Sequence, residues 1–224
     1  KYLFSFIITL GIALLLSLQP DIGQTLLVFF SWSVLIFTSG VSIFLLFFLF
    51  SSIILIFFYL IFFVSKFTYI KNRIISFLDS ETGTYNFQSD KALESIMSGG
   101  FFGKGIGEGT LKNRVPEAHT DYIISVISEE FGVIAIILIF LLFLVFIYSV
   151  FKKVNFENDE TIKLILVGSI SLILMQTIIH IGVNIRLFPT TGMTLPFISY
   201  GGSSIISISI LSGIILNFTK RNLN

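Results

Sequence analysis

Long runs without a charged residue constrain the fold of this chain more than any other feature. Residues 22–65 contain no Asp, Glu, Lys or Arg, and three further charge-free runs cover residues 131–151, 164–183 and 198–218. A helix that crosses the hydrocarbon core of a bilayer needs about 20 predominantly apolar residues. The sequence therefore predicts an integral membrane protein.

The apolar runs predict six transmembrane helices. Residues 2–18 are long enough for a first span, and residues 22–65 are long enough for two spans. The break between these two is expected at Ser39-Gly40, because Ser-Gly sequences favour turns. A transmembrane β-barrel would show short segments of alternating polarity, and runs such as Leu45–Phe50 do not alternate. We therefore expect an all-α polytopic membrane protein.

This assignment divides the chain into three parts. Residues 1–65 are expected to hold three transmembrane helices, and residues 66–121 a long extracytoplasmic loop with short helices. Residues 122–224 are expected to hold the other three transmembrane helices, with a short outer loop at residues 184–197. Because the chain begins at Lys1 rather than at Met, we also expect it to lack an N-terminal part.

Basic residues near the ends of the predicted helices indicate how the chain lies in the membrane. Lys152-Lys153 follow the fourth predicted helix, and Lys220-Arg221 follow the sixth. Short loops that stay in the cytoplasm carry an excess of Lys and Arg. We therefore expect a cytoplasmic C-terminus, with the long loop on the outer side.

The composition excludes several other classes of protein. Charged residues make up 12% of the 224 residues, against roughly 25% in soluble domains. The net charge of +1 gives no electrostatic footprint for a polyanion. The absence of cysteine excludes disulfides, thiolate metal sites and cysteine nucleophiles. A soluble enzyme or a secreted domain is therefore excluded, and no nucleic-acid partner is expected.

The long outer loop carries half of the charge of the chain, with seven basic and seven acidic residues. Loops of this length are uncommon in folded proteins unless they are functional or disordered. Within it, Ala92, Leu93, Ile96 and Met97 lie on one face of a helix predicted at residues 90–97. This pattern predicts a short helix that lies on the membrane surface.

A glycine-dense segment, Gly99–Gly109, follows the predicted short helix. It has the spacing of neither the Walker motif nor the dinucleotide-binding fingerprint, so no nucleotide is expected. One interpretation is a tightly turning loop that needs glycine for its backbone conformation. The other is a backbone cradle for a phosphate or a sugar, with Lys104 supplying positive charge.

Three ionisable residues, Glu117, His119 and Asp121, gather just before the fourth predicted transmembrane helix. Thr120 is expected to cap this helix, with Asp121 in its first turn, where a carboxylate interacts favourably with the helix dipole. The alternative is chemical, because such a cluster suits general acid–base catalysis or a hard metal ion such as Mg²⁺ or Mn²⁺. For Glu129-Glu130, which follow, solvation at the membrane interface is the simpler interpretation.

Polar residues also occur in or beside the predicted helices. Gln176, His180 and Asn184 are spaced four residues apart and form one stripe, which either makes interhelical hydrogen bonds or lines a polar cleft. Asp21 precedes the second helix and is expected to cap it. Residues 188–204 contain two prolines and three glycines. This irregular stretch is either a tight turn with close helix packing or the wall of an outward-facing cavity.

Three segments make the chain similar to the SEDS family (shape, elongation, division and sporulation). Residues 195–204, Leu-Pro-Phe-Ile-Ser-Tyr-Gly-Gly-Ser-Ser, resemble the family signature, and residues 116–121, Pro-Glu-Ala-His-Thr-Asp, resemble a second hallmark. Gln19-Pro20-Asp21-Ile22-Gly23 resembles a third. Their order and spacing fit the family over essentially the whole chain. Residues 117–119 and 189–196 resemble its division branch more than its elongation branch.

The resemblance implies a fold of about ten helices, of which this chain would hold the last six. It implies a glycosyltransferase that polymerises lipid II into peptidoglycan strands at the outer face of the cytoplasmic membrane, at the division septum for the division branch. The implied partners are lipid II, a class B penicillin-binding protein and other division proteins. The family's catalytic Asp maps to Asp121. The expected substrate-binding residues are Glu117, His119, Lys104, Lys112, Ser199, Gly201 and Gly202.

Glycan extension sets its own chemical requirements. A sugar hydroxyl displaces a lipid pyrophosphate from an anomeric carbon, through an oxocarbenium-like transition state. The leaving pyrophosphate needs positive charge, either from a divalent cation or from Lys and Arg. Asp121 is then either the general base for the attacking hydroxyl or a ligand of such a cation. Two other functions are compatible with the family, a lipid II flippase and a non-catalytic scaffold. The concentration of polar residues at the outer side favours the enzyme.

Overall fold

The computed structural model describes residues 2–19, 21–78 and 87–220, without the side chains of Lys66, Lys112 and Asn113. Helices and irregular connections make up this described part of the chain, and it contains no strand. The predicted all-α fold is therefore confirmed.

The elements follow the order of the predicted segments. The first part contains α1 (Tyr2–Leu18), α2 (Ile22–Thr38) and α3 (Ile43–Phe63). The long loop contains η1 (Ser65–Phe67), α4 (Thr68–Leu78), α5 (Phe87–Gly99) and η2 (Leu111–Arg114). The last part contains α6 (Ile123–Phe156), α7 (Glu160–Asn184) and α8 (Gly202–Lys220). The short outer loop thus extends to Gly201, four residues beyond its expected end.

Four of the described helices, α3, α6, α7 and α8, are long and apolar enough to cross a membrane. Helices α1 and α2 are also apolar and have 17 residues each, about the shortest length that spans a bilayer. These six helices occupy the six predicted apolar segments, which supports a polytopic membrane protein.

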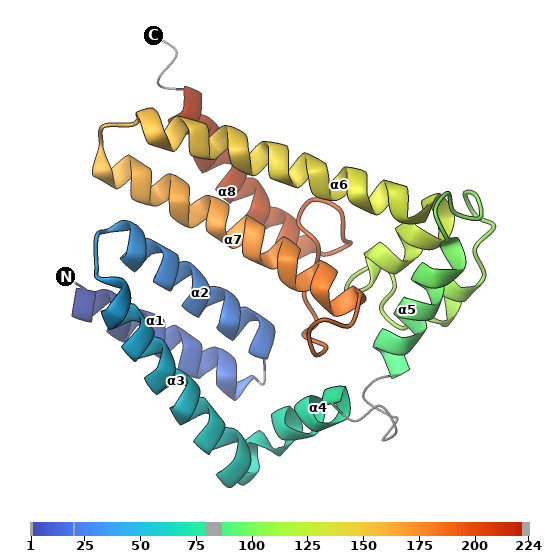
Figure 1. Ribbon diagram of the computed structural model, residues 1–224, viewed down its shortest axis with the longest axis horizontal. Helices are drawn as coiled ribbons and strands as arrows, with labels where there is room; N and C mark the ends of the chain where they lie inside the picture. Colours follow the sequence, from blue (N-terminus) through green and yellow to red (C-terminus); the bar gives the residue numbers. More distant parts are fainter. Residues whose placement is uncertain (1, 20, 79–86, 221–224) are drawn as a thin grey trace.

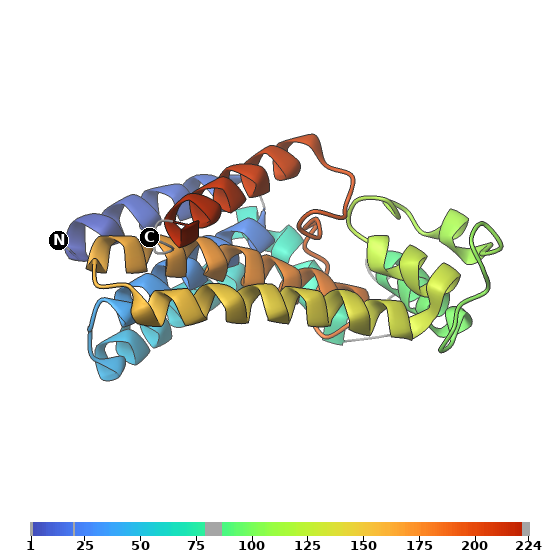
Figure 2. The same ribbon diagram turned by 90° about the horizontal axis from the view of Figure 1, so that it is seen from above.

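The long helices form one layered bundle (Figures 1 and 2). Helix α7 packs against α6 and α8 on one side and against α2 on the other, and α1 packs on α2. The core between α6, α7 and α8 includes Phe143, Ile147, Ile170, Ile173 and Ile208. Because lipid tails are as apolar as these side chains, close van der Waals packing holds such helices together.

Local sequence signals explain the ends of α2. Asp21 caps its N-terminus, since its carboxylate accepts a hydrogen bond from the backbone N–H of Gln24 at 3.0 Å. After α2 the chain turns at Gly40, whose φ of 88° lies in the left-handed region that glycine adopts without steric cost. The capping by Asp21 and the break at Ser39-Gly40 are therefore confirmed, while Pro20 lies outside the described residues.

Helix α6 is broken near its N-terminal end. The backbone of Gly132 (φ 79°, ψ 176°) is not helical, which leaves the next N–H groups without partners inside the helix. Carbonyl oxygens of the glycine-rich segment fill this gap. The N–H of Val133 donates to Gly100 at 3.0 Å, and that of Ile134 to Phe101 at 3.4 Å. The segment therefore acts as an N-terminal cap for the longer part of α6.

Glycine allows this close backbone contact. A β-carbon at Gly99 would lie 1.9 Å from the carbonyl oxygen of Ser128, and one at Gly103 would lie 2.2 Å from that of Glu130. A β-carbon at Gly132 would meet the Phe101 carbonyl oxygen at 2.1 Å. These contacts support the interpretation of Gly99–Gly109 as a tightly turning loop.

The short helix predicted at residues 90–97 is part of α5. Its Ala92 and Ile96 are buried, and α5 packs against α6, whereas Met97 is exposed. Two of the four residues of the predicted apolar face are therefore buried against protein. This corrects the expectation that the face lies on the membrane surface.

Candidate functional site

Asp121 lies in the turn that leads into α6. The carbonyl oxygen of Glu117 accepts hydrogen bonds from the N–H groups of Thr120, Asp121 and Tyr122 at 3.0–3.2 Å, and Glu117 has a φ of 54°. Tyr122 occupies the N-cap position of α6 without a side-chain cap, while the Thr120 hydroxyl donates to Glu117. The predicted capping by Thr120 is therefore wrong, because the chain turns tightly around Glu117 before the helix begins.

Three hydrogen bonds fix the backbone of residues 119–121. The N–H of Tyr200 donates to the carbonyl oxygen of His119 at 2.9 Å. The hydroxyl of Ser199 donates to the carbonyl oxygen of Thr120 at 2.7 Å. The side-chain amide of Asn184 donates to the carbonyl oxygen of Asp121 at 3.1 Å. The end of α7 and the segment before α8 thus position the turn that carries Asp121.

The polar stripe on α7 binds the irregular segment that follows it. The amide of Gln176 donates to the carbonyl oxygen of Thr194 at 2.9 Å, and Nδ1 of His180 lies 2.6 Å from that of Met193. Asn184 continues the stripe to the turn that carries Asp121. The partners of Gln176 and His180 therefore lie in the loop rather than on another helix, which corrects the expectation of interhelical bonds. Gln176 also lines a polar cavity, in keeping with the alternative of a polar cleft.

The surroundings of Asp121 raise the pKa of its carboxyl group. The carboxyl group is half-buried, and this desolvation raises its pKa above the usual value. The negative charges of Glu117 and Asp21 raise the pKa of Asp121 further, while the positive charge of Arg73 opposes them. Segments that are far apart in the sequence thus bring their charges together around one carboxylate.

Arg73 is the residue of this site that the sequence pattern did not indicate. It lies on α4, and its Nη1 donates to the carbonyl oxygen of Thr190 at 2.9 Å. Its guanidinium also lies over the ring of Tyr69, 4.4 Å from the centroid, and donates to the Tyr69 hydroxyl. Nothing in the local sequence distinguishes Arg73 from the other basic residues of the long loop, because its place at the site depends on how α4 packs.

The other expected site residues lie in several places. Glu117 and His119 have exposed side chains in the turn of Asp121, Ser199 is buried, and Gly202 begins α8. Lys104 lies on the glycine-rich segment, where its ammonium group is 3.5 Å from Glu129. The side chain of Lys112 lies outside what the structure describes. Their roles in substrate binding remain predictions.

Glu129 is completely buried, which corrects the expectation that it is solvated at the membrane interface. Its carboxylate accepts hydrogen bonds from the N–H groups of Thr110 and Leu111, both at 2.9 Å, and from the Ser95 hydroxyl at 3.1 Å. The ammonium group of Lys104 completes this set. Glu129 therefore joins α5, the glycine-rich segment and η2 to the first turns of α6.

A polar cavity of about 370 Å³ lies between α2, α7 and α8. A β-carbon added to Gly192, which lines the cavity, would lie 3.5 Å from the Asp121 carboxylate. Asp121 therefore adjoins the wall of this cavity. Its polar and glycine lining consists of Gln24, Gln176, Gly192, Thr194, Gly201, Ser203, Ser204 and Ser207.

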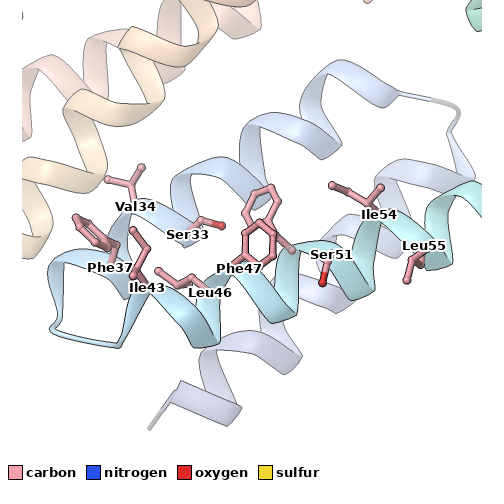
Figure 3. Close-up of a pocket in the computed structure, with 10 residues that line it drawn as sticks. Ser33, Val34, Phe37, Ile43, Leu46, Phe47, Ser51, Ile54 and Leu55 are labelled. Carbon is pink, nitrogen blue, oxygen red and sulfur yellow. The ribbon is translucent and has the colours of Figure 1, made fainter.

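Three apolar cavities adjoin one another along α2 and α3, and we call them together the α2–α3 groove. Phe50 lines all three. The largest has a volume of about 780 Å³ and is lined by side chains from both helices (Figure 3). The smallest, of about 220 Å³, is also lined by residues 188–191. Residues 188–192 therefore separate the groove from the polar cavity beside Asp121.

Comparison with known proteins assigns the family. The family profile described as "Cell cycle protein", which covers FtsW, RodA and SpoVE, matches residues 1–224. The chain belongs to the FtsW/RodA/SpoVE family. The predicted SEDS resemblance is confirmed.

Curated members of the FtsW/RodA/SpoVE family resemble the chain over most of its length. A protein of Caulobacter vibrioides is 36% identical over 212 residues, which cover 95% of this chain and 53% of the relative. A protein of Trichlorobacter lovleyi is 35% identical over 222 residues, which cover 97% and 56%. Each is named "Probable peptidoglycan glycosyltransferase FtsW". The chain thus spans about half the length of these relatives.

A solved structure supports the same assignment. It is 27% identical in sequence, with a TM-score of 0.81, and the match covers 100% of this chain and 63% of the other. That structure is described as "Structural coordination of polymerization and crosslinking by a peptidoglycan synthase complex". The FtsW/RodA/SpoVE fold of this chain is therefore supported by both sequence and structure.

Proposed function

We propose that this protein is part of a peptidoglycan glycosyltransferase of the division branch, which polymerises lipid II at the outer face of the cytoplasmic membrane. The observation that carries the proposal is the position of Asp121. It adjoins a polar cavity large enough for sugars, and the α2–α3 groove beside it suits a lipid tail. The names of the FtsW relatives point to the same activity.

Asp121 is suited to act as the general base. Its burial and its acidic neighbours raise its pKa, and a carboxylate with a raised pKa is a better proton acceptor. Hydrogen bonds from Tyr200, Ser199 and Asn184 fix the backbone of its turn. The carboxylate is therefore attached to a rigid segment of backbone. In this mechanism the ionised Asp121 takes the proton of the attacking sugar hydroxyl.

A divalent cation is compatible with the same residues. Mg²⁺ is commonly held by one or two carboxylates together with substrate phosphates and water. Asp121 and Glu117 would supply such carboxylates, although the described residues contain no group of three or more potential metal ligands. The cation would neutralise charge on the leaving pyrophosphate.

The proposal extends to partners and location. Lipid II is the proposed substrate, and a class B penicillin-binding protein is the proposed crosslinking partner, in keeping with the synthase complex that the fold resembles. We propose that the protein lies in the cytoplasmic membrane at the division septum, with its C-terminus in the cytoplasm. The flippase alternative gains no support from His180, which is bonded to a loop carbonyl group. Gln176 lines the polar cavity, which the proposal assigns to the sugar.

Polymerisation of labelled lipid II by the full-length protein and its partner tests the proposal. The variants are Asp121→Asn and, as a matched control, Glu108→Gln, which removes the same charge from an exposed position of the loop. We expect glycan ladders from wild type and control, and none from folded Asp121→Asn. Ladders from Asp121→Asn would reject the role of Asp121, and no ladders from folded wild type would reject the polymerase.

A further inference from the structure

The guanidinium of Arg73 is fixed where the α2–α3 groove meets the site. Nη1 donates to the carbonyl oxygen of Thr190, and Thr190 lines the outer end of the groove. Tyr69 holds the other side of the group through its ring and its hydroxyl. An Arg side chain held in this way is pre-organised, so less conformational freedom is lost when it binds an anion.

The positive charge of Arg73 lies near Asp121. Its Thr190 contact is two residues from Gly192, which adjoins the Asp121 carboxylate, and its charge opposes the rise in the pKa of Asp121. Two other basic groups of the outer region are engaged elsewhere. Arg186 pairs with Asp90 at 2.6 Å, and Lys104 pairs with Glu129. Of these three basic side chains, Arg73 is therefore the one placed to bind a ligand beside Asp121.

Arg73 retains hydrogen-bonding capacity for a ligand. A guanidinium has five N–H donors in a planar fork that matches two oxygens of a phosphate group. In the described part of the chain its acceptors are the Thr190 carbonyl group and the Tyr69 hydroxyl. Further N–H groups are thus left for an anion.

The order of the surfaces matches the order of groups in a lipid-linked sugar donor. Such a donor consists of an apolar tail, a pyrophosphate and a sugar, in that order. The structure places the apolar α2–α3 groove on one side of residues 188–192 and the polar cavity on the other. Arg73 contacts this dividing segment at Thr190, and Asp121 adjoins it at Gly192.

Resting on the proposed function, we propose that Arg73 binds the pyrophosphate of the lipid-linked donor, with the tail in the α2–α3 groove and the sugar towards Asp121. When the attacking hydroxyl forms the new glycosidic bond, the bond from the anomeric carbon to the pyrophosphate oxygen breaks. The electron pair of that bond leaves on the lipid pyrophosphate. The guanidinium stabilises this growing negative charge.

Lipid binding to the full-length protein in nanodiscs tests the inference separately from catalysis. The probes are polyprenyl pyrophosphate, polyprenyl monophosphate and inorganic pyrophosphate. The variants are Arg73→Gln and Arg73→Lys, with Arg186→Gln as the control for loss of an arginine near the same loop. We expect Arg73→Gln to weaken binding of polyprenyl pyrophosphate at least tenfold and to reduce its preference over the monophosphate. Arg73→Lys should fall between, because it keeps the charge but loses the fork, and Arg186→Gln should match wild type.

The outcomes separate this inference from the proposed function. Equal binding of polyprenyl pyrophosphate by wild type and Arg73→Gln would overturn the inference even if wild type polymerises lipid II. If inorganic pyrophosphate binds as tightly as polyprenyl pyrophosphate, the proposed placement of the lipid tail in the α2–α3 groove would be overturned. Loss of pyrophosphate preference in Arg73→Gln would support the inference even if wild type makes no ladders. Thermal unfolding checks that both variants fold, and partial preference in folded Arg73→Lys excludes a purely structural role.

Discussion

Glu129 offers a sharp test of how the outer loop is held to the bundle. It is an acidic side chain with no exposed surface, and it accepts hydrogen bonds from the backbone of residues 110 and 111. We compare Glu129→Gln and Glu129→Ala with Glu130→Gln. Glu130 is the adjacent acidic residue, and its carboxylate accepts a hydrogen bond from Gly107 at 3.2 Å at the exposed edge of the loop. The three variants therefore separate the buried carboxylate from a neighbouring one.

The expected cost follows from the contacts of Glu129. A hydrogen bond to a charged group contributes about 1.5–3 kcal/mol, and a neutral one about 0.5–1.5 kcal/mol. Gln keeps one carbonyl oxygen for the N–H groups of Thr110 and Leu111 but loses the charge, so Glu129→Gln should lower local stability by about 2 kcal/mol. Glu129→Ala removes both acceptor oxygens. Each buried donor left without a partner costs about 1–3 kcal/mol, so this variant should lose about 3–5 kcal/mol. Lys104 adds little to this difference, because its side chain is 38% exposed and water replaces its partner.

Hydrogen–deuterium exchange of the full-length protein measures this loss where it occurs. A loss of about 2 kcal/mol should accelerate exchange of the Thr110 and Leu111 amides roughly thirtyfold in Glu129→Gln, and Glu129→Ala should have a larger effect. Glu130→Gln should leave both amides unchanged. Unchanged protection at Thr110 and Leu111 in both Glu129 variants would refute the conclusion that this carboxylate holds the loop.

Three further predictions follow from the site and the broken helix. The pKa of Asp121 is raised and the proposed base is its ionised form, so the rate of polymerisation should fall with decreasing pH at a higher pH than for an ordinary carboxylate. Arg73→Gln removes a charge that lowers this pKa, so it should move the fall to a still higher pH. A pH–rate profile without either feature would contradict the assignment of Asp121 as the base. Gln176→Leu should lower stability by about 1–3 kcal/mol through the lost loop hydrogen bond and reduce specific activity less, so a stable but inactive protein would be inconsistent with a structural role. Gly132→Ala should destabilise the protein by at least about 1–3 kcal/mol because of its positive φ and the close carbonyl group, whereas Gly213→Ala, where the added carbon meets open space, should not; thermal unfolding compares the two.

The helices could be predicted because membrane spans impose a length and a polarity that are visible in the sequence. The ends of α2 were predictable for a different reason, because Asp21 and Gly40 determine the backbone only within a few residues of their own positions. The break in α6 was not, because Gly132 lies inside a charge-free run. Its conformation depends on a backbone segment some 30 positions earlier that supplies hydrogen-bond acceptors.

The candidate site was predictable only where its residues are adjacent in the sequence. Asp121 was singled out by its motif, and the structure adds the groups that surround it. Arg73 was missed because its contact with Thr190 spans more than a hundred residues. The burial of Glu129 was missed because it requires the loop to fold back over α6. Long-range packing, rather than local propensity, decides these features.

The backbone of residues 119–121 is held by groups that belong to other parts of the chain. Its three carbonyl oxygens receive hydrogen bonds from Tyr200, Ser199 and Asn184, and the side chain of Asp121 takes no part in these bonds. The shape of the turn therefore depends on the end of α7 and on the segment before α8, and not on the carboxylate that the turn carries. A substitution of the Asp121 side chain should accordingly leave the backbone of residues 119–121 in place.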